Sequence, residues 1–363
     1  MKKGNIYKGI ALSAACLFLL SGCQATEKAN DEMSDASKLK LSVRAVKNHR
    51  LNSVGMPDDW TNWGEIWENV ESRYKLSHKD EDMTSSEELV AFTRNTNKKD
   101  AVDIGDVGVM YAMQAEQNGL TQKYKTSYWD EIPDWAKDDD GDWIVSYYGT
   151  TAMLINTDIT GEAPTSFADV MKGDYKVAIT KVDSSNQAEY AVLSAAIANK
   201  GSEENIQPGI DYFSKLADEG RLVETTDVVN EMSNNNIGVA FLWDYTALSY
   251  RDTLSGQGGN YTVNIPSDGA VREGYATIIN ANAGNAEGAA LTREYILSDE
   301  GQTALAKGYA TPVRDIELPE SVLENRVPEE QYQNATWVEN REKWAQTLNT
   351  LGSKWNAIVE LKL

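Results

Sequence analysis

The sequence predicts an α/β fold divided into two domains. Stretches with alternating apolar residues, typical of strands, are repeatedly followed by stretches with apolar residues at helical spacing. This alternation of strands and helices indicates a parallel sheet covered by helices. The length of 363 residues exceeds the size at which a single hydrophobic core stops growing, so we expect two domains.

The composition is that of a globular protein that does not bind polyanions. Hydrophobic residues make up 41% of the chain and charged residues 25%, close to the average for soluble domains. The formal net charge is −22. So acidic a chain has no general basic field for nucleic acid or anionic lipid, and neither is expected as a partner.

The first 22 residues have the pattern of a secretory signal peptide. Three lysines precede an apolar run over 10–20, which is shorter than the roughly 20 residues of a membrane-spanning helix. The run ends in Leu20-Ser21-Gly22-Cys23, which resembles the lipobox of bacterial lipoproteins. The resemblance implies cleavage before Cys23 and lipidation of Cys23. The alternative is an ordinary signal peptide with a chance cysteine.

The sequence after the signal predicts a tethered body without thiol chemistry. Residues 23–38 are polar and without apolar period, so we expect a flexible tether. Removal of residues 1–22 would leave 341 residues with a net charge of −25, because that segment carries three lysines and no acid. Cys16 would leave with the signal, so no disulfide is expected.

The first half of the body alternates as an α/β sheet should. Trp60, Trp63 and Trp67 recur at helical spacing, and we expect a helix from 57–60 onward with these residues on its buried face. A second helix is expected from Ser85, with Glu88 completing a capping box. The predicted strands are 39–45, 101–107, 143–148 and 152–156.

The acidic stretch 138–142 is similar to a calcium-binding loop only at first sight. With Gly141 as the sixth loop position, the first and twelfth positions are Ala136 and Tyr147 instead of Asp and Glu. We therefore interpret the stretch as a solvated turn.

The second half continues the same pattern. We expect helices over 166–171, 188–199, 210–217 and 246–254, strands over 175–180, 237–243, 262–265 and 274–279, and mostly helices after 286. Ser184 and Ser185 are expected to cap the helix that follows them, and Asp244 is the N-cap candidate of the helix over 246–254.

From about residue 101 to 314, the order of short motifs resembles the solute-binding proteins of ABC importers. The motifs are the Asp-rich turn and Trp of 138–143, Ile155-Asn156, 164–167 with Asp169, 237–240, 265–269, 298–302, and 308–309 with 312–314. The most similar branch holds ferric-ion, polyamine, thiamine and phosphonate binders.

The resemblance implies a type II periplasmic-binding-protein fold: two α/β lobes, two crossing strands and a central ligand cleft. The expected first lobe comprises 39–149 plus 272–363, and the second comprises 150–271. The resemblance further implies a monomer, anchored by lipid on the outer side of the cell membrane or in the periplasm, that serves an ABC permease.

Candidate solute-binding residues follow from where the strands end, because ligands of open α/β sheets lie beyond the carboxyl ends of strands. Other candidates lie near the expected crossing strands. The full set is Asn48, His49, Asp106, Tyr147, Tyr148, Ser184, Ser185, Trp243, Asp244, Tyr245 and Tyr275.

These residues have structural alternatives as well. Trp243 can stack on a cation with Asp244 as its counter-charge, or it can belong to the core. Ser184 and Ser185 can hold an oxyanion at a helix start, or they can only cap that helix. Tyr147 and Tyr148 should point to opposite faces of their strand, so only one is expected to reach the cleft.

The sequence therefore predicts a non-enzymatic, solute-binding lipoprotein that takes a small cationic or zwitterionic organic solute, such as a polyamine-like compound. No cofactor and no resident metal are expected. The alternatives are a ferric-ion or phosphonate binder of the same family, and a secreted lipid-anchored hydrolase. The chain has only two histidines, His49 and His78, and no Gly-x-Ser-x-Gly, His-Glu-x-x-His or Walker A motif.

Overall fold

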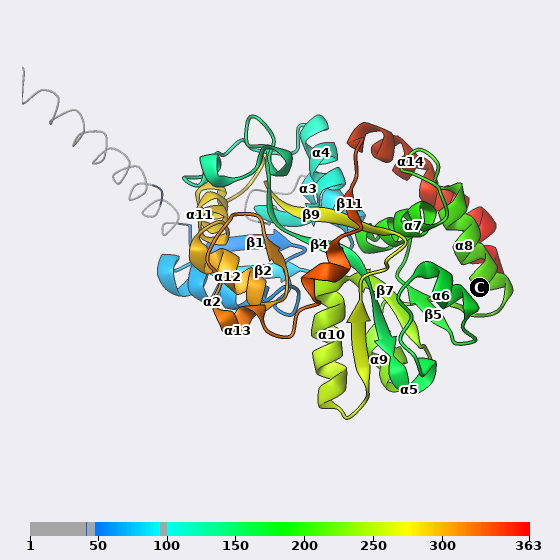
Figure 1. Ribbon diagram of the computed structural model, residues 1–363. Coiled ribbons are helices and arrows are strands. Elements are labelled where there is room, and N and C mark those ends of the chain that lie inside the picture. Colours follow the sequence, from blue (N-terminus) through cyan, green and yellow to red (C-terminus); the bar gives the residue numbers. More distant parts are fainter. Residues whose placement is uncertain (1–40, 42–47, 95–99) are drawn as a thin grey trace, which may run out of the picture.

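The computed structural model describes residues 41, 48–94 and 100–363 and shows two lobes built on one continuous twisted sheet (Figure 1). The predicted strand over 39–45 lies outside the described residues except for Leu41, which is helical.

The sheet and its covering helices alternate along the chain. The strands are β1 (Arg50–Val54), β2 (Ser77–Glu81), β3 (Ile104–Gly108), β4 (Trp143–Asn156), β5 (Val177–Ile179), β6 (Leu222–Glu224), β7 (Val239–Trp243), β8 (Tyr261–Asn264), β9 (Ala270–Ile279), β10 (Thr311–Pro312) and β11 (Ala335–Trp337). The helices are α2 (Trp63–Tyr74), α3 (Ser85–Thr93), α4 (Val109–Gln117), α5 (Thr157–Thr160), α6 (Phe167–Lys172), α7 (Asn186–Ala198), α8 (Gln207–Asp218), α9 (Val228–Ser233), α10 (Asp244–Gly256), α11 (Ala286–Ile296), α12 (Asp299–Lys307), α13 (Glu320–Leu323) and α14 (Arg341–Ile358), with short 3-10 turns η1 to η4 between them.

Strand β4 joins the two halves of the sheet, whose order is β2-β1-β3-β9-β4-β7-β5-β6. Its residues 143–150 pair with β9, and its residues 151–156 pair with β7 and β8. We call the half with β1, β2 and β3 lobe 1, and the half with β5, β6, β7 and β8 lobe 2. Strand β9 begins beside Thr151 and runs into lobe 1, so β4 and β9 are the two crossing strands. The predicted two-lobed fold is confirmed.

The periodic apolar residues of the sequence form the core as expected. Helix α2 buries Trp63, Ile66, Trp67 and Val70, which recur every three or four residues. The short strands β3 and β7 are buried along their whole length, and β7 is continuously apolar, as such burial predicts. Full burial of one side chain such as Ile66 stabilises the fold by roughly 1.5–3 kcal/mol.

Several predicted element ends are wrong by a few residues. Helix α2 begins at Trp63, so Trp60 precedes it. The capping box of α3 joins Thr84 to Glu87, which leaves Glu88 for another role. Helix α10 begins at Asp244, with Trp243 as its N-cap residue.

The C-terminal helix α14 packs against lobe 2, where Figure 1 shows it running along α8. Nζ of Lys362 lies 2.7 Å from a carboxylate oxygen of Asp218, and Nε1 of Trp355 donates to Glu224 at 3.2 Å. The sequence places all of 272–363 in lobe 1, whereas this last segment returns to lobe 2. Within residues 48–94 and 100–363, no helix combines the length and the apolar character needed to cross a membrane.

Candidate functional site

A cleft of about 390 Å³ lies between the lobes. Lobe 1 lines it with the loop after β1, the end of β2, the start of α3, and β3. Lobe 2 lines it with the loop before α7, the start of α7, and the first turns of α10. The charged and aromatic residues among the described lining are Asp59, Trp60, Asp82, Glu87, Glu88, Asp106, Lys181, Tyr245, Tyr250 and Tyr275.

Two acids with buried side chains, Glu88 and Asp106, line the lobe 1 wall near Gly55. Their exposed fractions are 3% and 1%. A Cβ atom on Gly55 would lie 2.5 Å from Oε1 of Glu88 and 2.5 Å from the main-chain oxygen of Asp106, and Gly55 has a φ of +70°. Glycine is therefore required where β1 ends, because no side chain fits and the left-handed backbone disfavours one. Oε2 of Glu88 and Oδ1 of Asp106 have no hydrogen-bond partner.

Two successive hydrogen bonds connect Trp60, Tyr147 and Asp106. Nε1 of Trp60 donates to the Tyr147 hydroxyl at 2.8 Å, and that hydroxyl donates to Oδ2 of Asp106 at 2.5 Å. Tyr147 is fully buried and does not itself line the cleft.

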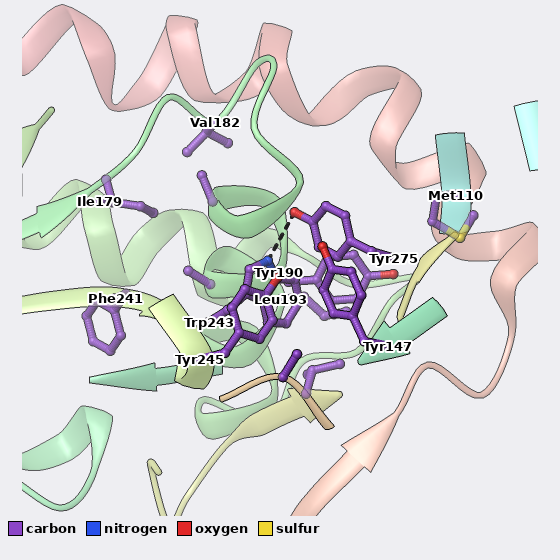
Figure 2. Close-up of a cluster of buried hydrophobic side chains, with 14 of the residues drawn as sticks. Met110, Tyr147, Ile179, Val182, Tyr190, Leu193, Phe241, Trp243, Tyr245 and Tyr275 are labelled. Atoms are coloured by element: carbon purple, nitrogen blue, oxygen red, sulfur yellow. Dashed lines mark hydrogen bonds between the residues drawn. The ribbon is translucent and has the colours of Figure 1, made fainter. Parts of the chain in front are cut away.

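Aromatic rings line the cleft and pack behind its lining. Trp60 contacts Tyr245 edge-on with 5.5 Å between ring centroids, and Tyr147 stacks parallel to Tyr275 at 5.6 Å. Figure 2 shows Tyr147, Tyr245, Tyr275 and Trp243 gathered in this cluster, with the hydrogen bond from Nε1 of Trp243 to the Tyr275 hydroxyl. Such ring faces attract cations.

The cleft raises the pKa of its acids. Burial, followed by the charges of Asp106, Asp82 and Asp80, raises the pKa of Glu88 well above its usual range. Burial likewise raises the pKa of Asp106 well above its usual range, although the Tyr147 hydrogen bond acts in the opposite direction. Without a bound cation, this wall therefore favours the protonated carboxyl groups.

The lobe 2 wall presents buried polar groups that carry no charge. Asn186 is the first residue of α7 and only 2% exposed, and its side-chain amide makes no well-directed hydrogen bond. It lies close enough to the Tyr275 hydroxyl to oppose the burial that raises the pKa of Tyr275. The hydroxyls of Tyr245 and Thr246 are buried and unpartnered.

Comparison with known proteins agrees with this geometry. Residues 99–343 match the family model described as bacterial extracellular solute-binding protein. The chain belongs to this family.

Solved structures show the same fold at low sequence identity. AfuA of Actinobacillus pleuropneumoniae, with fructose-6-phosphate bound, is 16% identical and has a TM-score of 0.68 over 86% of this chain and 98% of that chain. Iron-bound HitA of Pseudomonas aeruginosa is 15% identical, with a TM-score of 0.65 over 84% and 99%. An ABC transporter protein of Clostridium perfringens is 20% identical, with a TM-score of 0.62 over 85% and 99%. Curated protein sequences include no significant match. These likenesses show that the chain shares the fold of these proteins.

Of the residues that the sequence singles out, four lie together in the lining of this solute-binding protein: Asp106, Ser185, Tyr245 and Tyr275. Tyr147 stands one layer behind them. Tyr148 points away, as the strand alternation predicts, and its ring lies 5.8 Å from Trp135 and 5.2 Å from Trp337. Ser184 is half-buried and outside the lining.

Asn48 and His49 lie at the wrong end of their strand. The sequence places them after a strand, whereas they precede β1 and are exposed. Nδ2 of Asn48 donates to the main-chain oxygen of Gly284 at 2.7 Å, and Nδ1 of His49 lies 3.1 Å from the oxygen of Lys75. Neither residue lines the cleft.

Trp243 and Asp244 are part of the structure that supports the cleft. Trp243 is fully buried, and its main-chain N–H donates to Gln187. Both Asp244 oxygens are occupied: Oδ1 accepts from the N–H groups of Thr150 and Tyr245, and Oδ2 accepts from the Tyr332 hydroxyl at 2.9 Å. Asp244 thus joins β4, α10 and the C-terminal segment and has no free oxygen for a solute.

Sequence reasoning missed three residues that line the cleft: Glu88 and Trp60 in lobe 1 and Asn186 in lobe 2. Glu88 looked like a capping residue, and Trp60 looked like part of a helix face. A signal for Glu88 was present: it lies one residue after the Glu of the true capping box, on the buried side of α3 with Ala91 and Phe92. Asn186 had no signal except its position after the capping serines.

One acidic group outside the cleft has the spacing of a metal site. Among residues 48–94 and 100–363, Glu116, Asp138 and Asp142 each offer one oxygen within 4.8 Å of the others. Each is already engaged, for example Glu116 with Nε1 of Trp143 at 2.9 Å and Asp142 with Thr121 at 2.6 Å. These contacts explain the acidic turn as local structure.

Proposed function

We propose that this protein captures a small organic amine outside the cell and delivers it to an ABC permease. The observation that carries the proposal is the pair of buried carboxylates with unpartnered oxygens, Glu88 and Asp106, in the lining of the cleft. An unpaired buried carboxylate is costly, and an ammonium group supplies both the charge and the hydrogen-bond donors that it lacks.

The surroundings of the pair support an amine. Trp60, Tyr245, Tyr250 and Tyr275 offer aromatic faces to an alkyl chain and its charge. Three further carboxylates, Asp59, Asp82 and Glu87, lie at the rim and raise the local concentration of cations.

The geometry supports iron less well. HitA is described with bound iron, but here His49 lies at the amino end of β1, and Tyr147 is occupied by Trp60 and Asp106. A purely anionic solute such as a phosphonate would meet five carboxylates and one lysine among the described lining residues. Like charges in a cleft of low dielectric repel strongly.

The lipobox-like ending at Cys23 supports a lipid anchor as part of the same proposal. A chain cleaved before Cys23 and lipidated there would remain on the outer side of the membrane, and residues 23–38 would serve as its tether. A monomer suffices for the function, because both walls of the cleft come from one chain.

The proposed function includes no turnover of the solute. Oγ of Ser53 lies 2.8 Å from Nε2 of His78, which is a serine–histidine contact. However, Ser53 is only 1% exposed, and its hydroxyl donates to Asp80 at 2.5 Å, so it has no access to a solute in the cleft.

A ligand screen tests the proposal. We expect amines to raise the melting temperature of the purified soluble body (residues 24–363) in a thermal-shift screen that also contains ferric ion, phosphonates, sugar phosphates and thiamine. Mass spectrometry after long incubation should recover the amine unchanged. Stabilisation by ferric ion or phosphonates alone would overturn the amine proposal, and a hydrolysed product would indicate an enzyme.

A further inference from the structure

The two walls of the cleft carry opposite charge. All five carboxylates among the described lining residues belong to lobe 1: Glu88 and Asp106 are buried, and Asp59, Asp82 and Glu87 are exposed. The cation among these residues, Lys181, belongs to lobe 2, where Nζ also lies 3.5 Å from Asp183. The cleft is therefore polarised from one lobe to the other.

The unpartnered polar atoms divide in the same way. On lobe 1, Oε2 of Glu88 and Oδ1 of Asp106 can accept hydrogen bonds. On lobe 2, the Tyr245 and Thr246 hydroxyls and the Asn186 amide can donate hydrogen bonds as well as accept them. The Thr61 hydroxyl of lobe 1 is also unpartnered and can do either. The ionised carboxylates of lobe 1 can only accept, whereas these groups of lobe 2 can donate to a bound oxyanion.

The start of α7 adds a partial positive charge to the lobe 2 wall. This helix has 13 residues, and its N-cap residue, Ser185, makes no capping hydrogen bond through its side chain. Instead Oγ of Ser185 lies 3.1 Å from Oγ1 of Thr180. The first N–H groups of a helix attract anions, and Ser185 and Asn186 both lie in the lining.

We propose that the solute is a zwitterion that spans the two lobes. Its ammonium group binds Glu88 and Asp106, and its oxyanion binds Lys181, Asn186 and the start of α7. This inference rests on the proposed function and narrows it from amines in general to amines that also carry an acidic group. Because the two ends bind different lobes, the solute itself holds the lobes together.

A diamine matches the charges of this cleft less well than a zwitterion does. Its second ammonium group would face Lys181 and the positive end of α7 and would leave the donors of lobe 2 without partners. A simple monoamine would satisfy lobe 1 only. The proposed contacts therefore predict different affinities for zwitterions, diamines and monoamines. A cleft that was acidic on both walls would not favour the zwitterion.

Titration calorimetry with matched compounds tests the inference. The probes are ω-amino acids of three to six carbons, the monoamines and diamines of the same lengths, and 2-aminoethyl phosphate. We expect the best amino acid or aminoalkyl phosphate to bind at least tenfold tighter than the monoamine and the diamine of matched length. The comparison of carboxylate with phosphate identifies the oxyanion.

Lys181→Met locates the acidic end. Lys181 is exposed, so the variant should fold, and Lys215→Met on the surface of α8 is the matched control. We expect Lys181→Met to weaken the amino acid or the aminoalkyl phosphate about tenfold, to leave the monoamine unchanged, and to strengthen the diamine. Thr246→Val and Asn186→Ala should also weaken binding of the zwitterion while leaving binding of the monoamine unchanged.

The outcomes separate this inference from the proposed function. Diamine or monoamine binding that equals zwitterion binding, or equal effects of Lys181→Met and Lys215→Met, would overturn the zwitterion but leave an amine-binding protein. Failure of every amine to bind would overturn both.

Discussion

The hydroxyl of Tyr147 donates a hydrogen bond to Oδ2 of Asp106, with 2.5 Å between the two oxygens. Since the same hydroxyl accepts from Nε1 of Trp60, its proton is directed at the carboxylate. In the proposed function, Tyr147 therefore acts on the solute through Asp106, as a positioning residue.

Replacement of Tyr147 by Phe should weaken amine binding through this hydrogen bond. A hydrogen bond to a charged group contributes about 1.5–3 kcal/mol, so we expect affinity at neutral pH to fall by roughly one to two decades. Because the lost bond favours the charged form, the pKa of Asp106 should rise further, and affinity should recover in part at higher pH. Calorimetry from pH 6 to 9 measures both effects.

Tyr148→Phe is the matched control, since Tyr148 lies next in the strand but faces Trp135 and Trp337. A Tyr147→Phe variant that binds as tightly as Tyr148→Phe at every pH would show that the hydrogen bond has no role in binding.

Glu88→Gln should separate stability from binding. Removal of a buried carboxyl group relieves an unfavourable burial, so the ligand-free protein should unfold at an equal or higher temperature. Amine affinity should fall at least tenfold, because one partner of a charged pair is gone. Glu116→Gln, outside the cleft, is the control for general loss of charge. Unchanged affinity in Glu88→Gln would remove Glu88 from the site.

The stability of the ligand-free protein should fall between about pH 6.5 and 8. Burial raises the pKa of Glu189 to about 8 from 4.5, and the pKa of Glu88 and of Asp106 is raised as well. In this range the folded protein holds protons that the unfolded chain has lost, so each such group lowers the free energy of unfolding by up to about 1.4 kcal/mol per pH unit.

We expect this fall in stability to begin at about pH 6.5, because below that pH the titration of His78 changes stability in the opposite direction. Burial lowers the pKa of His78 to about 4, so between pH 4 and 6.5 its contribution to stability rises with pH. Urea titrations at pH 6.5 and 8 measure the slope for the wild type and for Glu189→Gln, which should reduce it. A saturating amine should also reduce it, since it favours the ionised carboxylates. An identical dependence of stability on pH in all three samples would contradict the raised pKa values of these buried acids.

Asp244→Asn should affect the fold more than the binding. The carboxylate receives three hydrogen bonds, and an amide nitrogen cannot accept the one from the Tyr332 hydroxyl. We expect a loss of stability of about 1 kcal/mol and an amine affinity within threefold of wild type. Chemical denaturation and calorimetry measure the two quantities. Tyr332→Phe and the double variant complete a cycle that isolates the pair. A loss of affinity of tenfold or more without a loss of stability would return Asp244 to the solute site.

Cys23→Ala tests the anchor. If Cys23 carries the lipid, the variant should leave the membrane fraction of the native host and appear in the medium or periplasm, because the polar tether offers no other attachment. Fractionation with an antibody against the body measures this. Wild-type protein found entirely in soluble fractions would argue against lipidation.

The sequence by itself determined what depends on near neighbours in the chain. The apolar spacing of Trp63 and Trp67 specifies the buried face of α2, and the apolar runs of β4 and β7 specify buried strands, because side-chain direction repeats with a period set by the backbone. The start of α7 after Ser185 was predictable for the same reason, although the expected capping hydrogen bond of the Ser185 side chain is absent.

Only the tertiary structure decided which of these pieces form the site. Glu88 meets Asp106 because α3 packs beside β3, and Asn186 faces lobe 1 because α7 starts where Gly108 leaves it room. One oxygen of Asp244 is occupied by the hydroxyl of Tyr332, which is 88 residues away in the chain. Such contacts depend on strand order and on the approach of the two lobes. The periodicity of apolar residues carries no information about such contacts. A buried acid therefore looks the same in the sequence whether it caps a helix, joins two segments or binds a solute.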